Sequence, residues 1–413
     1  MTAPSTTVRF DRAIWLLLAD WLAVVVAVVL PWSTSATGIC IALWLVALLP
    51  TLDWAAVKRE VMSPAGGLPV LLWALGATGM LWADVDWHAR LGGLDGFHRL
   101  LAIPLVLIQF RRSEHGIRVL WGFFISCGVL LIASYALAFT PGLTWRGRAN
   151  GVPVHDDIFQ NTEFLVCGFA AIGVACAQFR KRHWPVMLAF FAIAALYLAN
   201  MAFVFLSRAA LLVIPALALL LGWRELRWKG CVAAIVLASL AGATMWVAAP
   251  ALRGRIEGSL AEIRDYRATN AATPIGQHTA FLKESIGIIA DAPIIGHGTG
   301  SIPEQFRRIT VGAEGVSALN TVNPHNQTFA VAIQLGIVGA VLLWAMWVVH
   351  FRLFCGGGTV AWFGIVVVME NIVSSAVHSH LFDFANGWLY VFGVGVLGGM
   401  VLRERDKADG AAG

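Results

Sequence analysis

A histidine beside a predicted helix start is the strongest candidate for chemistry in this chain. Asn323-Pro324-His325-Asn326 precedes an apolar run that continues to residue 349. Asparagine is a good N-cap and proline suits the first helical position, so the pattern predicts His325 in the first turn of a helix. A helix N-terminus disfavours imidazolium and suits an anion, and a neutral imidazole can act as a general base. The alternative interpretation is a capping cluster with a histidine at the membrane interface.

An arginine at the edge of another apolar run could bind phosphate. Arg208 lies within Leu206-Ser207-Arg208-Ala209-Ala210. A guanidinium can hold two phosphate oxygens at once. However, an arginine at a membrane boundary must pair or extend into water, so a role in topology or a salt bridge with Glu163 explains it equally well. Both interpretations remain open on the sequence alone.

Three other polar patterns are less specific. The glycine-rich stretch 292–301 follows no predicted strand and lacks G-x-G-x-x-G spacing, so we expect a tight turn rather than a nucleotide site. His378, His380 and Asp383 have a spacing that a metal could use, and acidic residues occupy 156–157. Neither group has a convincing ligand set, and we expect polar loop clusters without metal.

The composition shows which kind of protein must position these residues. Hydrophobic residues make up 59%, charged residues 13%, and the mean hydropathy is +0.75. Soluble proteins have about 25% charged residues, so soluble globular, disordered and coiled-coil proteins are excluded. The net charge of +5 does not indicate nucleic-acid binding, because the basic residues form short clusters between apolar runs. The six cysteines show no metal-binding or disulfide pattern.

The hydropathy pattern predicts an all-α polytopic membrane protein with about twelve transmembrane helices. A spanning helix needs about 20 apolar residues. The first apolar run is long enough to span, and we interpret it as a retained helix rather than a cleaved signal. The predicted spans are 13–30, 37–51, 66–82, 97–110, 117–139, 161–179, 185–203, 207–222, 231–249, 326–349, 358–378 and 384–402.

The basic clusters predict the sides of the membrane. With both termini in the cytoplasm, most short basic loops are cytoplasmic, as the positive-inside rule requires. The chain then divides into helices over 1–249, an outer loop over 250–325, and helices with a cytoplasmic tail over 326–413. Apolar residues recur at helical spacing twice in the outer loop, which predicts amphipathic helices. A smaller outer loop carries Arg146 and Arg148, further candidates for substrate binding.

Three segments together resemble the O-antigen ligase and O-antigen polymerase superfamily. They are Ser207-Arg208-Ala209, the stretch 288–300, and Pro324-His325-Asn326-Gln327-Thr328-Phe329, which is followed by Leu335-Gly336. Their order and spacing are similar to those of the family, as is a long outer loop late in a polytopic chain. The resemblance covers roughly residues 160 to 400.

The resemblance implies a fold similar to the membrane-embedded GT-C glycosyltransferases and a reaction at the periplasmic face of the bacterial inner membrane. A glycan would pass from undecaprenyl diphosphate to a sugar hydroxyl of lipid A-core, with inversion and without a metal or other cofactor. His325 would be the base and Arg208 would hold the diphosphate. Apart from these substrates and membrane lipid, no partner is implied, and a monomer is compatible with the sequence.

The chain departs from the family pattern at the second diphosphate-binding position. The family usually has an arginine shortly before the segment that begins here at Phe281, whereas this chain has Gln277 and His278. Arg264, Arg267 or His278 would take that role instead. Two further residues are grouped with the substrate-binding set, and they are Asn326, beside the base, and Asp383, matched to an acidic residue between the last two helices.

The alternatives differ in the acceptor or in the class of protein. An O-antigen polymerase or a protein O-oligosaccharyltransferase would use the same donor chemistry, and we favour the ligase because the chain is compact with one dominant loop. A polytopic transporter is the non-enzyme alternative. It is disfavoured because the long segment follows the ninth predicted span and no internal repeat relates two halves.

Overall fold

The computed structural model describes residues 12–140, 142, 151–154, 157–248, 250–312 and 318–412. All regular structure in these residues is helical, which confirms the predicted fold class. The helices are α1 (Arg12–Val29), α2 (Thr34–Leu48), η1 (Leu49–Thr51), α3 (Trp54–Met62), α4 (Pro64–Gly79), α5 (Trp87–His98), η2 (Arg99–Leu101), α6 (Ala102–Arg112), α7 (Gly116–Phe139), α8 (Asp157–Arg180), α9 (Trp184–Phe203), α10 (Arg208–Ala248), α11 (Pro250–Thr269), α12 (Pro274–Asp291), α13 (Ile302–Thr310), α14 (Gln327–Leu353), α15 (Thr359–Ser374) and α16 (Phe384–Ala412).

Within the described residues, nine helices are long and apolar enough to cross a membrane, or ten if one bent pair counts as a span. The expected twelve runs are helical, and the lower number has three local causes. Helix α10 takes up two of the runs, which meet at Arg227 with a φ of 56°. Helix α15 is shorter than a full span. Helices α3 and α4 meet at an angle of 84°, where Ser63 caps α4 and Pro64 opens it.

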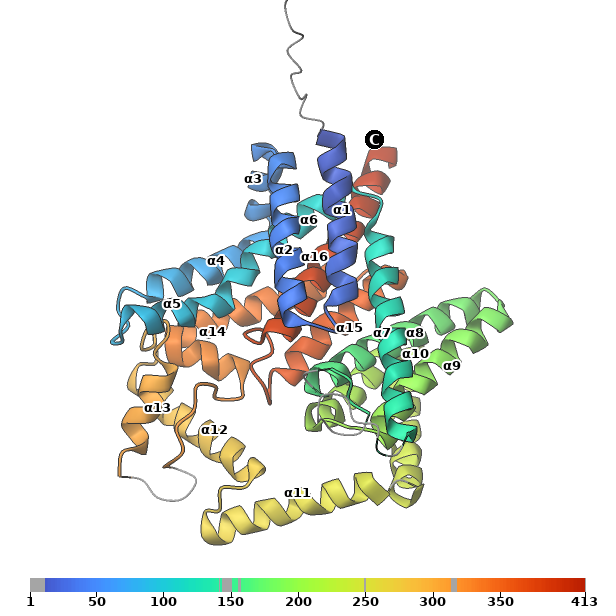
Figure 1. Ribbon diagram of the computed structural model, residues 1–413. Coiled ribbons are helices and arrows are strands. Elements are labelled where there is room, and N and C mark those ends of the chain that lie inside the picture. Colours follow the sequence, from blue (N-terminus) through green and yellow to red (C-terminus); the bar gives the residue numbers. More distant parts are fainter. Residues whose placement is uncertain are drawn as a thin grey trace, which may run out of the picture.

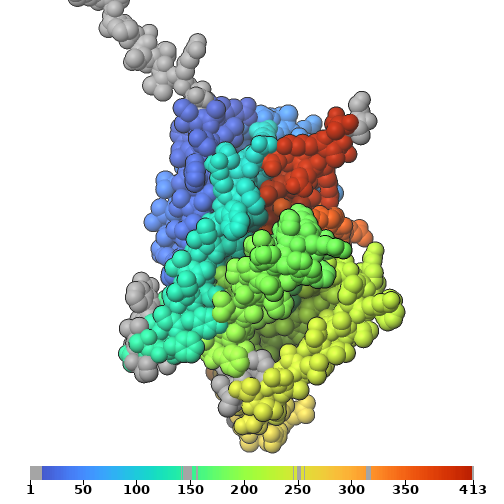
Figure 2. Space-filling view, turned by 90° about the vertical axis from the view of Figure 1, so that its right-hand side faces the viewer, coloured from blue at the N-terminus to red at the C-terminus, as the bar shows by residue number. Residues whose placement is uncertain are grey.

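The long outer loop folds into helices, as its periodicity predicts. Helices α11 and α12 correspond to the two expected amphipathic stretches, and α13 is a third, short helix. These helices lie at one end of the molecule, whereas the start of α1 and the end of α16 lie at the opposite end (Figure 1). The space-filling view shows the same separation of the yellow loop helices from the blue and red terminal helices (Figure 2).

Small residues allow the core helices to pack closely. Gly395, Gly398 and Gly399 on α16 face Val106 and Phe110 among other residues of α6, and a Cβ at any of the three glycines would collide with a neighbour. Close backbone approach at small residues is how helices associate in a membrane, where lipid competes for apolar surface. The outer faces of α1, α9 and α10 carry exposed large apolar side chains, as lipid contact requires.

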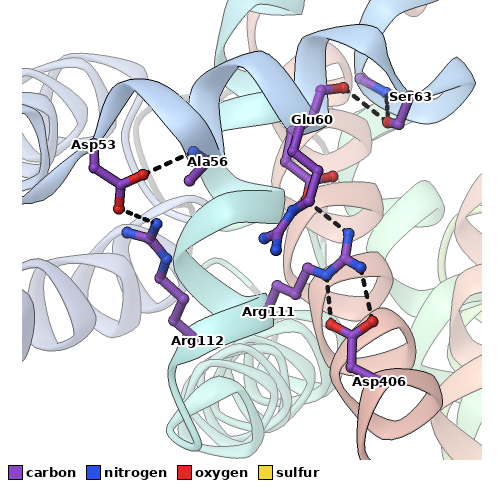
Figure 3. Close-up of polar contacts among 9 residues, drawn as sticks. Asp53, Ala56, Glu60, Ser63, Arg111, Arg112 and Asp406 are labelled. Carbon is purple, nitrogen blue, oxygen red and sulfur yellow. Dashed lines mark hydrogen bonds and ion pairs between the residues drawn. The ribbon is translucent and has the colours of Figure 1, made fainter. Parts of the chain in front are cut away.

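An ion-pair network ties three elements together at the end where the termini lie. Arg111 of α6 contacts Glu60 of α3 and Asp406 of α16, each at 2.7 Å (Figure 3). Arg112 pairs with Asp53, which caps α3 (Figure 3). Glu60 is fully buried, so its guanidinium partners are needed to offset its desolvation. The network therefore lies at the end of the molecule opposite the loop helices α11, α12 and α13 (Figure 1).

The glycine-rich stretch docks onto a break in α14. Gly336 has a φ of 61° and interrupts the helical hydrogen bonding. Gly298 N–H therefore donates to the Gln334 carbonyl at 2.8 Å, and Ile337 N–H donates to the Pro293 carbonyl at 2.8 Å. The predicted tight turn is confirmed, and it supplies the partners that the broken helix lacks. This docking joins the end of α12 to the start of α14.

Candidate active site

His325 lies immediately before α14 and not in its first turn, so the helix start predicted from the sequence is wrong. Asn326, rather than Asn323, is the N-cap, and its Oδ1 accepts a hydrogen bond from Phe329 N–H at 3.0 Å. Asn323 instead holds the preceding turn, because its Oδ1 accepts from His325 N–H at 2.9 Å. His325 adopts a left-handed backbone with a φ of 54°. Its imidazole is thereby turned into the protein beside the helix end.

Three histidines from separate segments meet around this position. The His325 ring lies 4.4 Å from the ring of His278 on α12 and 5.7 Å from that of His378, between α15 and α16. Phe281 of α12 stacks on the His325 ring at 6.2 Å with an interplanar angle of 14°. His325 Nδ1 is buried and has no hydrogen-bond partner among the residues that the structure describes. This nitrogen therefore has an unused hydrogen-bonding capacity, but His325 does not line either of the two cavities described below.

Burial keeps the cluster neutral. Desolvation lowers the pKa of His325 below its usual 6.5. Desolvation, followed by the positive charge of a protonated His325, lowers the pKa of His278 and of His378 to about 4. Asp383 and Asp157 oppose the shift at His378. The neutral imidazole that a general base needs thus arises from burial, and the helix dipole that we invoked from the sequence is not required.

Arg208 opens α10 next to the histidine cluster. Ser207 caps this helix by accepting from Ala210 N–H at 3.2 Å, and Asn161 of α8 accepts from Ser207 N–H at 3.1 Å. The Arg208 side chain is 48% exposed and forms an ion pair at 3.0 Å with Glu262 of α11, whereas the sequence analysis had considered Glu163 as its partner. The backbone before Arg208 is thus held by the contacts of Ser207, whereas the Arg208 guanidinium pairs with the Glu262 carboxylate in a partly exposed position.

A cavity of about 640 Å³ is lined by Arg208 and by two of the three histidines, His278 and His378. Its polar lining includes Arg208, Glu262, His278 and His378. The rest of its wall is largely apolar and comes from Ile158, Phe205, Leu206, Leu211, Ile256 and Leu260. The arrangement offers a cation and imidazoles at one side of an apolar chamber, which suits an anionic head group that carries a hydrocarbon chain.

A second cavity, of about 290 Å³, borders the first. The two share His378 and Ile158 as wall residues. The smaller one is polar, with Asn323, His380 and Asp383 among its lining residues. Asp383, a candidate from the sequence, therefore lies near the histidine cluster and faces this second space.

The remaining candidates divide into three groups. Arg264 and Arg267 are exposed on α11, and the linings of the two cavities do not include them. Asn326 caps α14, and its Nδ2 donates to the Ala376 carbonyl at 3.1 Å, so its contacts are structural. Arg146, Arg148 and Asp156 lie outside the described residues. Within the described ranges, no group of three or more His, Cys, Asp or Glu side chains is arranged to hold a metal ion.

Three side chains of the site, those of Glu262, Phe281 and His378, could not be assigned to it from sequence motifs. Glu262 and Phe281 carried no motif, and helical periodicity could place them only on amphipathic stretches. The spacing of His378 from His380 indicates at most a metal ligand. In the structure His378 instead faces His325 and borders both cavities.

Residues 193–344 match the family model described as O-Antigen ligase. This region, which is less than half of the chain, is similar to the O-antigen ligase family. The matched residues include Arg208, His278 and His325, so the cation and two of the three imidazoles lie within the family region, whereas His378 lies outside it. A comparison with curated proteins finds no match.

The family sets the class of activity. Its members are glycosyltransferase-like enzymes, ligases or polymerases, that act on lipid-linked glycans. The nine or ten candidate spans of the described residues make the chain a multi-pass membrane protein, and its matched region is that of this enzyme class rather than of a transporter.

Proposed function

We propose that this protein is an O-antigen ligase. It transfers polymerised glycan from undecaprenyl diphosphate to a sugar hydroxyl of lipid A-core at the periplasmic face of the bacterial inner membrane. The observation that carries the proposal is that one cavity is lined both by Arg208 and by His278 and His378, the two histidines whose rings flank that of His325.

In this proposal the larger cavity takes the donor. Arg208 binds the diphosphate oxygens in place of the Glu262 carboxylate, and neutral His278 donates a hydrogen bond from its ring N–H. The apolar wall accepts the first part of the isoprenoid chain. Diphosphate is a good leaving group, so it requires stabilisation of the charge that develops on it rather than a proton.

His325 then serves as the general base. The acceptor hydroxyl oxygen attacks the anomeric carbon of the donor sugar while its proton passes to the imidazole of His325. The bond between that carbon and the diphosphate oxygen breaks, and the electron pair leaves with the diphosphate. Attack opposite the leaving group inverts the anomeric centre. Proton removal of this kind contributes about 10²–10⁴-fold to a rate.

Transfer with purified components tests the proposal. Protein in detergent is mixed with lipid-linked O-antigen donor and rough lipopolysaccharide, with and without excess EDTA. We expect glycan on lipid A-core in both samples. Products that grow on the lipid carrier, with none on core, would overturn the ligase assignment and indicate a polymerase.

The glycan profile of a deletion strain gives an independent answer. Loss of a ligase leaves bare core and long chains on the lipid carrier. Loss of a polymerase leaves core that carries single repeat units, and that profile would contradict the proposal.

A further inference from the structure

The smaller, 290 Å³ cavity contains buried polar atoms without partners. The His380 side chain is 1% exposed. Its Nε2 has no hydrogen-bond partner among the described residues. Its Nδ1 lies 3.7 Å from Glu370 Oε1, which is too far for a hydrogen bond. Asn386 is 4% exposed, and its Oδ1 also has no partner within the described part of the chain. Both residues line the cavity. Leaving such groups unsatisfied is costly, so their presence at one cavity points to a polar ligand.

The lining matches a neutral polyhydroxylated molecule. A ring nitrogen can accept or donate according to its tautomer, and the Asn386 amide offers a free acceptor. Asp383 adds a carboxylate, whose Oδ1 already accepts from Asn386 Nδ2 at 2.9 Å. The space corresponds to roughly ten water molecules, which is enough for one sugar ring but not for a chain of several sugars.

The position of the cavity indicates which sugar it takes. The larger cavity holds Arg208, and the two cavities adjoin at His378, whose ring faces the His325 ring. A leaving diphosphate at Arg208 requires the attacking hydroxyl to approach from the other side of the donor sugar. The smaller cavity adjoins the larger one but does not include Arg208 in its lining, so it is the neighbouring space from which that hydroxyl can approach.

We propose that this cavity is the acceptor subsite, in which His380, Asn386 and Asp383 bind the ring of the acceptor sugar that carries the attacking hydroxyl. The proposal rests on the function proposed above, and it adds residues that the family match at 193–344 does not contain. These residues are positioning and specificity residues, because the proton goes to His325.

A pair of asparagine variants tests the subsite. Asn386→Leu removes an amide that lines the cavity. Asn371→Leu is the matched control, because Asn371 is equally buried and also has an unpartnered Oδ1 within the described residues, but it does not line the cavity. We expect Asn386→Leu to raise the KM for rough lipopolysaccharide by about 3-fold to 10-fold, the effect of one lost hydrogen bond. The KM for the donor and the kcat at saturating acceptor should stay near wild type.

Three outcomes overturn the proposal. An increase in the donor KM instead of the acceptor KM assigns the cavity to a donor sugar. An equal change in Asn371→Leu shows a structural effect. An unchanged acceptor KM in both Asn386→Leu and His380→Phe leaves only water in the cavity.

A binding measurement separates failure of this inference from failure of the proposed function. Wild-type protein without donor is titrated with rough lipopolysaccharide and with lipid A that lacks core sugars. The inference requires tighter binding of the core-bearing lipid, and competition by delipidated core oligosaccharide against the acceptor but not the donor. Equal binding of the two lipids contradicts it, whether or not the protein transfers glycan. Absence of transfer by wild type, with core-dependent binding intact, contradicts the ligase function alone.

Discussion

At the scale of single residues, the site depends on where one imidazole points. Left-handed backbone at His325 is uncommon for a residue with a side chain. The Asn323 side chain holds this turn, and the Phe281 ring covers the imidazole. The result is a buried, neutral ring whose Nδ1 has no hydrogen-bond partner among the described residues.

Removing the His325 base should abolish most of the transfer. His325→Gln keeps hydrogen-bonding capacity but cannot take the proton, so we expect single-turnover transfer to fall by about 10²–10⁴-fold. His325→Ala should be equally poor. Thermal unfolding and donor binding, measured on the same preparations, should stay near wild type. A wild-type rate in His325→Gln would leave His325 as a structural residue only.

The pH dependence of transfer should reflect burial of the same ring. The neutral imidazole is the active form, so kcat/KM should fall as pH decreases through the pKa of His325. Burial lowers that pKa from 6.5, so the midpoint of the acid limb should lie below pH 6.5. Initial rates at subsaturating donor between about pH 4.5 and about pH 8 measure this midpoint. A midpoint above 6.5 is the contrary result.

At the scale of elements, the contact between α10 and α11 places an ion pair, Arg208 with Glu262, in the wall of the larger cavity. Glu262 holds Arg208 at 3.0 Å and also accepts from Ile275 N–H at the start of α12, at 3.1 Å. One carboxylate therefore joins three helices and occupies the guanidinium that the diphosphate would use.

Charge removal at Glu262 should favour donor binding. Glu262→Gln keeps an acceptor for Ile275 N–H but releases Arg208, so we expect the donor KM to fall by about 1.5-fold to 5-fold, as for loss of an exposed ion pair. Arg208→Lys should instead lose most transfer, because an ammonium cannot bind two phosphate oxygens in a fixed plane. Steady-state kinetics at saturating acceptor measure both variants. Normal transfer by Arg208→Lys would reduce the role of Arg208 to that of a point charge.

The break in α14 should be essential for the shape of the site. A Cβ at Gly336 would meet the Ile294 carbonyl and force a left-handed residue, so Gly336→Ala should lower stability by about 1–3 kcal/mol and reduce transfer. Gly287→Ala on α12 is the control, since its Cβ meets nothing within 4 Å. The control should be neutral or stabilising by up to about 1 kcal/mol. Equal thermal-unfolding temperatures for the two variants would show that the break is not required.

At the scale of the whole molecule, the two ends differ in kind. One end has the termini and the ion-pair network of Arg111, Arg112 and their acidic partners (Figure 3). The other end has the loop helices α11, α12 and α13 (Figure 1). Residues of these helices contribute to the walls of the two cavities. A bilayer between them would separate the site from the cytoplasm.

Labelling of cysteines should reveal this orientation. Lys283→Cys introduces an exposed thiol on α12, and native Cys355 is exposed near the end where Arg405 of α16 contacts the Leu353 carbonyl. In cells with a permeabilised outer membrane, an impermeant maleimide should label position 283. Cys355 should react only after lysis. The reverse pattern would place the site in the cytoplasm and contradict the proposed reaction.

Hydropathy and local spacing were sufficient for the fold class, the helical runs and the identity of Arg208 and His325 as candidates. These properties depend on side chains near one another in the chain: lipid contact selects apolar runs, and turn chemistry marks their ends. The amphipathic helices and the glycine-rich turn were predictable for the same reason. The family resemblance, carried by short motifs, is confirmed by the match over 193–344.

Tertiary packing decided everything that joins separate segments. By sequence, either Asn323 or Asn326 could cap α14. In the structure Asn326 is the cap, and its side chain also donates to the Ala376 carbonyl between α15 and α16. His325 therefore lies outside the helix. Packing of α12 and that same segment brings His278 and His378 to His325, and burial then keeps their imidazoles neutral. The sequence motifs do not predict these contacts, because the contacts depend on segments that are distant in the chain and share one buried space.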